Sequence, residues 1–211
     1  MKKDLIIFDL DGTLINTDTL YTLGWKTILK GYGVALPEAT LAQMNGQSTE
    51  KNNEIVNSYL NSWERTLEAR NKREEFVMDA MEMGLLVMKP GARELLEQLK
   101  SAGRRMALAT SSPSERAKGH IAELGLEHYF EFIIYGDQVS EKKPSPEMYT
   151  TVLEKLGVSP KNSVAIEDSP SGVQSALAAG LDVYLVTDRD TTEFVENPNV
   201  HILESLTGLE L

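Results

Sequence analysis

The sequence contains no cysteine and has three histidines, so two common kinds of metal ligand are scarce. Without cysteine the chain cannot form disulfides, zinc thiolate sites or a thiol nucleophile. His120, His128 and His201 are too widely spaced for an HExxH pair or a histidine cluster. These absences exclude thiol catalysis, disulfide scaffolds and the usual zinc sites.

Long hydrophobic runs and an excess of basic charge are also missing. No apolar run approaches the ~20 residues of a membrane span, and acids interrupt the N-terminal MKKDLIIFDLDG too early for a signal peptide. The formal net charge of -11 argues against binding the phosphate backbone of DNA or RNA. We therefore expect a cytoplasmic protein without membrane or nucleic-acid partners, and a monomer as the default state.

The composition is that of a globular protein, and two parts of the chain differ in their pattern of apolar residues. Its 211 residues, 41% hydrophobic and 25% charged, suffice for one sizeable core or for a domain with a smaller insertion. Residues 17–85 follow a helical pattern and contain no convincing strand. One helical face is predicted from the three- and four-residue spacing of Ile55, Val56, Tyr59, Leu60, Trp63 and Leu67.

Short apolar runs alternate with amphipathic segments from Pro90 onward. Including the first run, the predicted strands are 4–9, 105–110, 130–136, 163–168 and 182–187. Ser112 to Glu115, SPSE, reads as a capping box at the start of a helix. Such alternation favours βαβ units. We predict an α/β fold in which residues 1–14 and 87–211 form a Rossmann-like parallel sheet core with helices on both faces, and residues 15–86 form an inserted α-helical cap domain.

Polar side chains follow the predicted strands where ligands bind in an open parallel sheet, outside the carboxyl ends. They are Asp9 and Asp11 after the first strand, Thr110, Ser111 and Ser112 after the second, Lys143 beyond the third, and Glu167 and Asp168 after the fourth. Within the first strand a period of two would turn Asp9 and Asp11 to one side and Leu10 to the other. Four strands would thus deliver carboxylates, hydroxyls and an ammonium to one edge.

Each of these features alone has a simpler explanation. Asp-Gly is a common hairpin turn, Thr110 and Ser112 fit helix caps, and a lone Lys143 would be a solvated lysine. An EF-hand fits poorly, because its glycine and glutamate positions hold Leu14 and Leu20. Taken together, these residues indicate a metal site. Carboxylates at one edge repel each other unless a cation binds between them, and oxygen ligands favour Mg²⁺. Hydroxyls at a helix N-terminus and a lysine suit an anion, which indicates phosphoryl transfer.

Four segments in order resemble the motifs of the haloacid dehalogenase superfamily of phosphotransferases. They are Asp9 to Leu14, DLDGTL; Thr110 and Ser111; Lys143 to Pro146, KPSP; and Glu167 to Ser169, EDS, with Gly172 and Ala178 to Gly180, AAG. The helical insertion is similar to the cap of the β-phosphoglucomutase-like branch. The resemblance spans nearly the whole chain and implies a HAD-like phosphatase fold and activity.

The resemblance also implies roles for matched residues. Asp9 would be the nucleophile that carries an aspartyl-phosphate, and Asp11 would protonate the departing oxygen and then activate water. The implied Mg²⁺ ligands are Asp9, the backbone carbonyl of Asp11 and Asp168, with Glu167 assisting. Phosphate oxygens would be held by Thr110, the Ser111 N–H and Lys143. The implied partner is a small phosphorylated metabolite.

Two activities remain open within the resemblance, phosphomonoester hydrolysis and a β-phosphoglucomutase-like hexose phosphate transfer; a binding protein without catalysis is a third reading. The mutases resemble this chain at Thr17, Trp25 and Lys72, but they carry a histidine where this chain has Tyr21. That difference favours a hydrolase acting on a sugar phosphate or similar metabolite. The candidate substrate contacts in the cap are Tyr21, Asn45, Gln47 and Lys72.

Overall fold

The computed structural model describes residues 3–45, 49–187 and 191–211. Contacts divide the chain into two compact units: a core unit, Met1–Ile15 with Met88–Leu211, and a cap unit, Asn16–Val87. Each junction lies one residue from the bound expected from the sequence. The cap unit is thus inserted into the chain directly after the first strand and its following turn.

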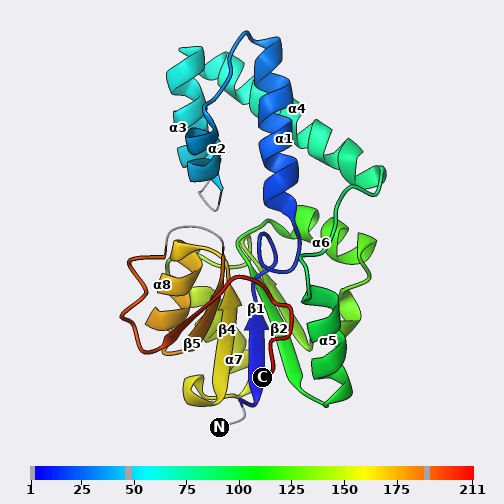
Figure 1. Ribbon diagram of the computed structural model, residues 1–211, viewed down its shortest axis with the longest axis vertical. Helices are drawn as coiled ribbons and strands as arrows, with labels where there is room; N and C mark the ends of the chain where they lie inside the picture. The colour runs from blue at the N-terminus through cyan, green and yellow to red at the C-terminus, as the bar shows by residue number, and fades with distance from the viewer. Residues whose placement is uncertain (1–2, 46–48, 188–190) are drawn as a thin grey trace. The chain divides into compact units, whose positions relative to one another are not determined.

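The core unit is built on a parallel sheet, shown with its surrounding helices in Figure 1. In the described residues it has six strands in the order β3-β2-β1-β4-β5-β6, and every neighbouring pair is parallel. The strands are β1 (Leu5–Phe8), β2 (Arg105–Thr110), β3 (Phe132–Tyr135), β4 (Ser163–Glu167), β5 (Asp182–Val186) and β6 (Val200–Leu203). The predicted Rossmann-like class is confirmed.

Five of the strands lie where the sequence predicts them, but β6 was missed. β6 is an edge strand of sequence VHIL in which only Val200 is buried, and His201 interrupts its apolar residues. The central strands β1 and β4 have no exposed residue, as both faces of a parallel sheet are covered.

In the part of the core unit that the structure describes, four helices connect the strands, one before β2 and one after each of β2, β3 and β4. They are α5 (Ala92–Ser101), α6 (Ser114–Glu123), α7 (Glu147–Leu156) and α8 (Pro170–Ala178), with short 3-10 turns η1 (Glu127–Tyr129) and η2 (Pro160–Asn162). Helices α7 and α8 bury Val152 and Val173 in one hydrophobic cluster with Leu5 and Ile7 of β1. Ser169 caps α8, because its side chain accepts a hydrogen bond from the Gly172 N–H.

The capping box predicted at Ser112 is wrong. Helix α6 begins at Ser114, and the residue before it, Pro113, has no side-chain hydrogen bond to the helix. The Ser114 N–H instead bonds to the Asp137 carboxylate, at 3.0 Å. An acid from another loop therefore caps this helix, which leaves the Ser112 hydroxyl available for a different partner.

β1 lies at the point where the strand order reverses. Its neighbours are β2 and β4, from which the chain continues in opposite directions across the sheet. A crevice for ligands opens at such a position, outside the carboxyl ends of the strands. β1 ends at Phe8, and Leu10 begins a tight turn in which Gly12 has a φ of 85°. Asp9 therefore directly follows the strand, and Asp11 lies in the turn. Strand periodicity does not set the directions of their side chains.

The cap unit is helical in its described residues, with α1 (Thr17–Gly31), α2 (Glu38–Met44), α3 (Thr49–Leu60) and α4 (Trp63–Glu82). The single helical face predicted across 55–67 is wrong, because the chain breaks between α3 and α4. Asn61 has a φ of 50°, and the Ser62 side chain caps α4 by accepting from the Arg65 N–H. Trp63 and Leu67 are consequently about half exposed, whereas Val56 is buried. None of the helices described is both long and apolar enough to cross a membrane.

The break at Asn61 predicts opposite effects of two small substitutions. Asn61→Ala should lower stability by about 1 kcal/mol, since a residue with a Cβ resists the left-handed region, whereas Asn61→Gly should match or exceed wild type. Calorimetric melting of the three proteins tests this. An alanine variant that melts higher than wild type would instead indicate one helix continuing through this position.

Candidate active site

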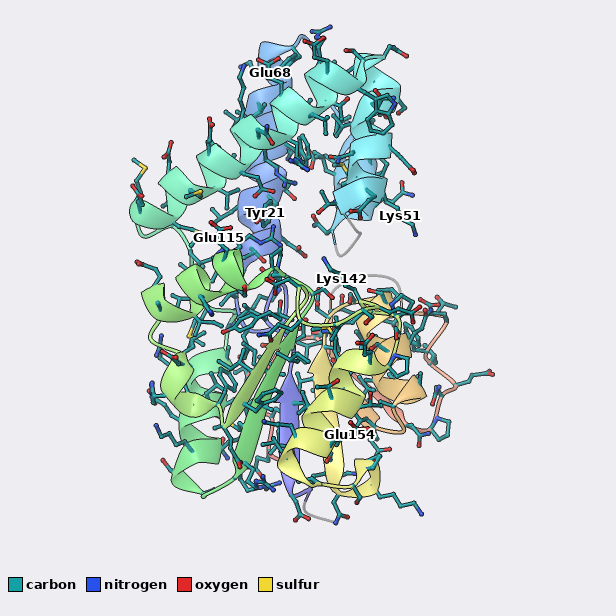
Figure 2. All side chains as sticks on the ribbon, turned by 180° about the vertical axis from the view of Figure 1, so that it is seen from behind. Tyr21, Lys51, Glu68, Glu115, Lys142 and Glu154 are labelled. Carbon is teal, nitrogen blue, oxygen red and sulfur yellow. The ribbon has the colours of Figure 1, made fainter. Side chains whose placement is uncertain are left out.

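Lys143 joins the ends of three strands. Its Nζ donates to Asp9 Oδ1 at 2.6 Å, to Glu167 Oε1 at 2.7 Å and to the carbonyl of Ala109 at 2.8 Å. Asp9 follows β1, Glu167 ends β4 and Ala109 lies in β2. The lysine itself comes from the loop between β3 and α7, and Figure 2 labels its neighbour Lys142 at the carboxyl end of the sheet. One ammonium group thus ties together side chains that the sequence separates by more than a hundred residues.

Three carboxylates gather around this lysine. Asp9, Glu167 and Asp168 each offer an oxygen within 4.8 Å of the others, and all three residues are buried. Two glycines make room for them. A Cβ on Gly12 would lie 2.4 Å from Asp168 Oδ2, and one on Gly172 would lie 2.0 Å from the Glu167 carboxyl. Any side chain at either glycine would displace an acid of the cluster.

The charges of this cluster do not balance. Burial raises the pKa of Asp9 well above its ordinary value; Glu167 and Asp168 raise it further, and Lys143 opposes them. Burial alone would lower the pKa of Lys143, but Asp9 and Glu167 outweigh it and raise that pKa. If all three carboxylates were ionised, they would exceed the single ammonium by two negative charges, and the repulsion among them is part of what raises the pKa of Asp9. An all-oxygen donor set with that excess fits a hard divalent cation such as Mg²⁺.

Tyr149 supports the cluster from α7 and was not singled out from the sequence. Its hydroxyl donates to Glu167 Oε1 at 2.5 Å, and Lys143 Nζ lies 5.2 Å from the centre of its ring. Burial and the Glu167 charge raise the pKa of Tyr149, so it keeps the proton that it donates. In the sequence Tyr149 lies six residues after Lys143, where it looks like an ordinary buried residue of a helix. Its role could therefore not be predicted from the sequence.

Asp11 contacts hydroxyls on the side of β2. Ser112 Oγ donates to Asp11 Oδ2 at 2.6 Å, and Thr110 Oγ1 donates to the same oxygen at 3.3 Å. The Ser112 N–H also donates to Thr110 Oγ1, at 3.1 Å. Thr110 therefore lies at the expected edge, with its hydroxyl directed to the second acid, and Ser112 joins the site in place of its predicted role as a helix cap.

Ser111 is positioned by a close approach of two loops. The Gly136 N–H, just after β3, donates to the carbonyl of Ser112 at 2.9 Å. A Cβ on Gly136 would lie 2.1 Å from the Ser111 carbonyl oxygen. Glycine at this position is what lets the peptide of Ser111 lie at the carboxyl edge beside Thr110.

The candidate Tyr21 belongs to the cap unit, where Figure 2 labels it on α1. Its hydroxyl donates to Glu74 Oε2 at 3.4 Å, and the Arg73 guanidinium lies 4.6 Å from the centre of its ring. The same guanidinium lies 4.6 Å from the Trp25 ring centre. Tyr21 and Trp25 therefore share a cation between α1 and α4, which gives both a structural part in the cap.

The other cap candidates have partners within the same unit or are not described. Asn45 Oδ1 accepts from Thr22 Oγ1 at 3.3 Å. Lys72 pairs with Glu68 at 2.8 Å one turn earlier on α4, and the hydrogen bond with Glu68 raises the pKa of Lys72. Gln47 lies outside the described residues. Their part in substrate binding stays a prediction.

Several known proteins are similar to this chain over most of its length. The sequence profile of the family described as haloacid dehalogenase-like hydrolase matches residues 6–186. The phosphorylated carbohydrates phosphatase of Thermotoga maritima is 37% identical over 179 residues, covering 85% of this chain and 82% of that protein. The fructose-1-phosphate phosphatase YqaB of Escherichia coli is 32% identical, covering 84% of this chain and 93% of that protein.

A solved structure shares the fold of the whole chain. CbbY from Rhodobacter sphaeroides, crystallised in complex with phosphate, has a TM-score of 0.77 and 26% identity, covering 98% of this chain and 96% of that one. The phosphatases among the relatives confirm the expected enzyme class, a phosphoric monoester hydrolase. The chain belongs to the haloacid dehalogenase-like hydrolase family.

Proposed function

We propose that the protein is a Mg²⁺-dependent phosphatase that hydrolyses a small phosphomonoester, a sugar phosphate or similar metabolite, through an aspartyl-phosphate on Asp9. The observation that carries the proposal is the Lys143 ammonium bonded to both Asp9 and Glu167 next to Asp168. The names of two relatives, phosphatases of phosphorylated carbohydrates and of fructose 1-phosphate, support the substrate class.

The proposed reaction has two steps that use two acids. In the first, an oxygen of Asp9 bonds to phosphorus while the bond to the leaving oxygen breaks, and Asp11 gives that oxygen its proton. In the second, Asp11 takes a proton from water as the water oxygen bonds to phosphorus, which releases inorganic phosphate and restores the Asp9 carboxylate. Lys143 and Thr110 contact Asp9 and Asp11, respectively, so they lie where phosphate oxygens would be bound.

Asp9, Asp168 and the backbone carbonyl of Asp11 would hold Mg²⁺, with Glu167 assisting. When bound, the cation supplies the positive charge that lets an anionic carboxylate approach an anionic phosphate. The three carboxylates crowded around a single ammonium are the structural reason to expect it.

A panel of sugar phosphates, nucleotides and phosphoglycolate should identify the reaction. With Mg²⁺ present, at least one sugar phosphate should release inorganic phosphate, and a sugar bisphosphate should not stimulate the reaction. Phosphate release and the positions of phosphate on the sugar are measured together. Interconversion of positions with stimulation by a bisphosphate would indicate the mutase instead, and no turnover of any compound would contradict both.

Asp9→Asn should lower kcat at least about 10⁴-fold while leaving the fold intact, because an amide cannot take up the phosphoryl group. Asp4→Asn is the matched control, since Asp4 is an exposed acid at the opposite end of β1. Steady-state rates and circular dichroism of both variants test the role. An Asp9 variant that turns over substrate at the wild-type rate would rule out the nucleophile.

Asp168→Asn should weaken Mg²⁺ binding by about 10-fold or more, since it removes a charged oxygen ligand. Mg²⁺ titration by calorimetry and the Mg²⁺-induced rise in melting temperature give two readouts that do not depend on turnover. Asp182→Asn serves as the control, because that carboxylate pairs with Lys3 at 2.7 Å. Equal Mg²⁺ affinity in the wild-type protein and both variants would contradict the ligand assignment.

A further inference from the structure

Asp11 is linked to a cation that lies outside the matched motifs. An Arg116 guanidinium N–H donates to Ser112 Oγ at 2.7 Å, and Ser112 Oγ donates to Asp11 Oδ2 at 2.6 Å. The serine hydroxyl is therefore acceptor to one residue and donor to the other. A charged donor on its oxygen polarises the hydroxyl and strengthens the bond that it donates.

The geometry follows from where α6 begins. Arg116 is the third residue of α6 and lies four residues after Ser112; Figure 2 labels its neighbour Glu115 on this helix. Helical side chains tilt toward the N-terminus of their helix, so Arg116 reaches back to the loop after β2. A cation in the first turn opposes the helix dipole, whereas Glu115 suits it. The charge of Arg116 therefore does not stabilise its own helix through the dipole, whereas its guanidinium does bond to Ser112.

We propose that Arg116 is a positioning residue for Asp11 that acts through Ser112. This proposal rests on the proposed function, in which Asp11 protonates the leaving oxygen. A proton donor is effective only within hydrogen-bond reach of the oxygen that it serves. With Oδ2 bonded to the polarised Ser112 hydroxyl, the Asp11 carboxyl is restricted to one orientation during that transfer.

Other groups around Asp11 set the size of the expected effect. Thr110 Oγ1 is a second donor to Oδ2 at 3.3 Å, and His120 Nδ1 lies 3.8 Å from Oδ1. Loss of Arg116 therefore weakens one of several restraints and leaves Asp11 in place. The expected loss is a part of the contribution of one general acid, about 10- to 100-fold.

The test compares two leaving groups. Arg116→Met removes the donor and keeps an apolar stem, and it should lower kcat/KM for the best sugar phosphate about 10- to 100-fold. For p-nitrophenyl phosphate the change should stay within about threefold, because p-nitrophenolate leaves without a proton. Arg116→Lys should recover much of the loss. Lys118→Met, which removes an exposed cation from the same helix, should behave like wild type on both substrates.

A double-mutant cycle with Ser112→Ala tests the route of the effect. If Arg116 acts through Ser112, the Ser112→Ala, Arg116→Met double variant should be no slower than Ser112→Ala alone. Additive losses, or equal losses on both leaving groups, would overturn the proposal. Activity of the wild-type protein distinguishes failure of this role from failure of the proposed function. A wild-type protein that hydrolyses no phosphate ester overturns both, whereas an active wild type whose variants show additive losses or equal losses on both leaving groups overturns the role of Arg116 alone.

Discussion

The buried bonds from Lys143 to Asp9 and Glu167 are the interaction on which the rest of this structure depends. Charges buried this deeply are tolerated when they are paired and hydrogen-bonded, and removal of one partner leaves the others uncompensated. Much of the surroundings serves this arrangement: Gly12 and Gly172 leave space for carboxyls, and Tyr149 donates to Glu167. In the proposed function, the same carboxylates hold a cation and, with it, a phosphate.

The sheet explains why such distant residues can meet. Parallel strands bring all their carboxyl ends to one edge, and β1 sits where the strand order reverses. A residue that directly follows a central strand is thus near the ends of two neighbours. This position places Asp9 near its partners. Lys143, from the loop after β3, has a side chain long enough to reach Asp9 and the carbonyl of Ala109 at the same edge.

How far the sequence predicts this site differs from residue to residue. Asp9, Lys143 and Asp168 could be placed together because each follows an apolar run, and the carboxyl ends of such runs share an edge. Ser112 could be placed at the same edge, but its bond to Asp11 could not be predicted, because a serine before a helix reads as a cap. Only the tertiary structure shows that Asp137 takes that part.

Local patterns also failed where one tertiary contact or one backbone angle decides the outcome. Spacing across 55–67 suggests a single helix, but Asn61 takes a left-handed conformation that periodicity does not reveal. Tyr149 looks like any buried helix residue until its hydroxyl is seen on Glu167. Arg116 lies outside every matched motif, and its link to Asp11 depends on where α6 begins.

The central claim is that Asp9 itself takes up the phosphoryl group, and trapping that group tests it most directly. Protein quenched in acid during turnover of its best substrate is digested, and its peptides are mapped by mass spectrometry. The account predicts a phosphoryl group on the peptide that contains Asp9, lost when Asp9 is replaced by asparagine. A phosphoryl group on a different residue, or turnover by the asparagine variant at the wild-type rate, would contradict it.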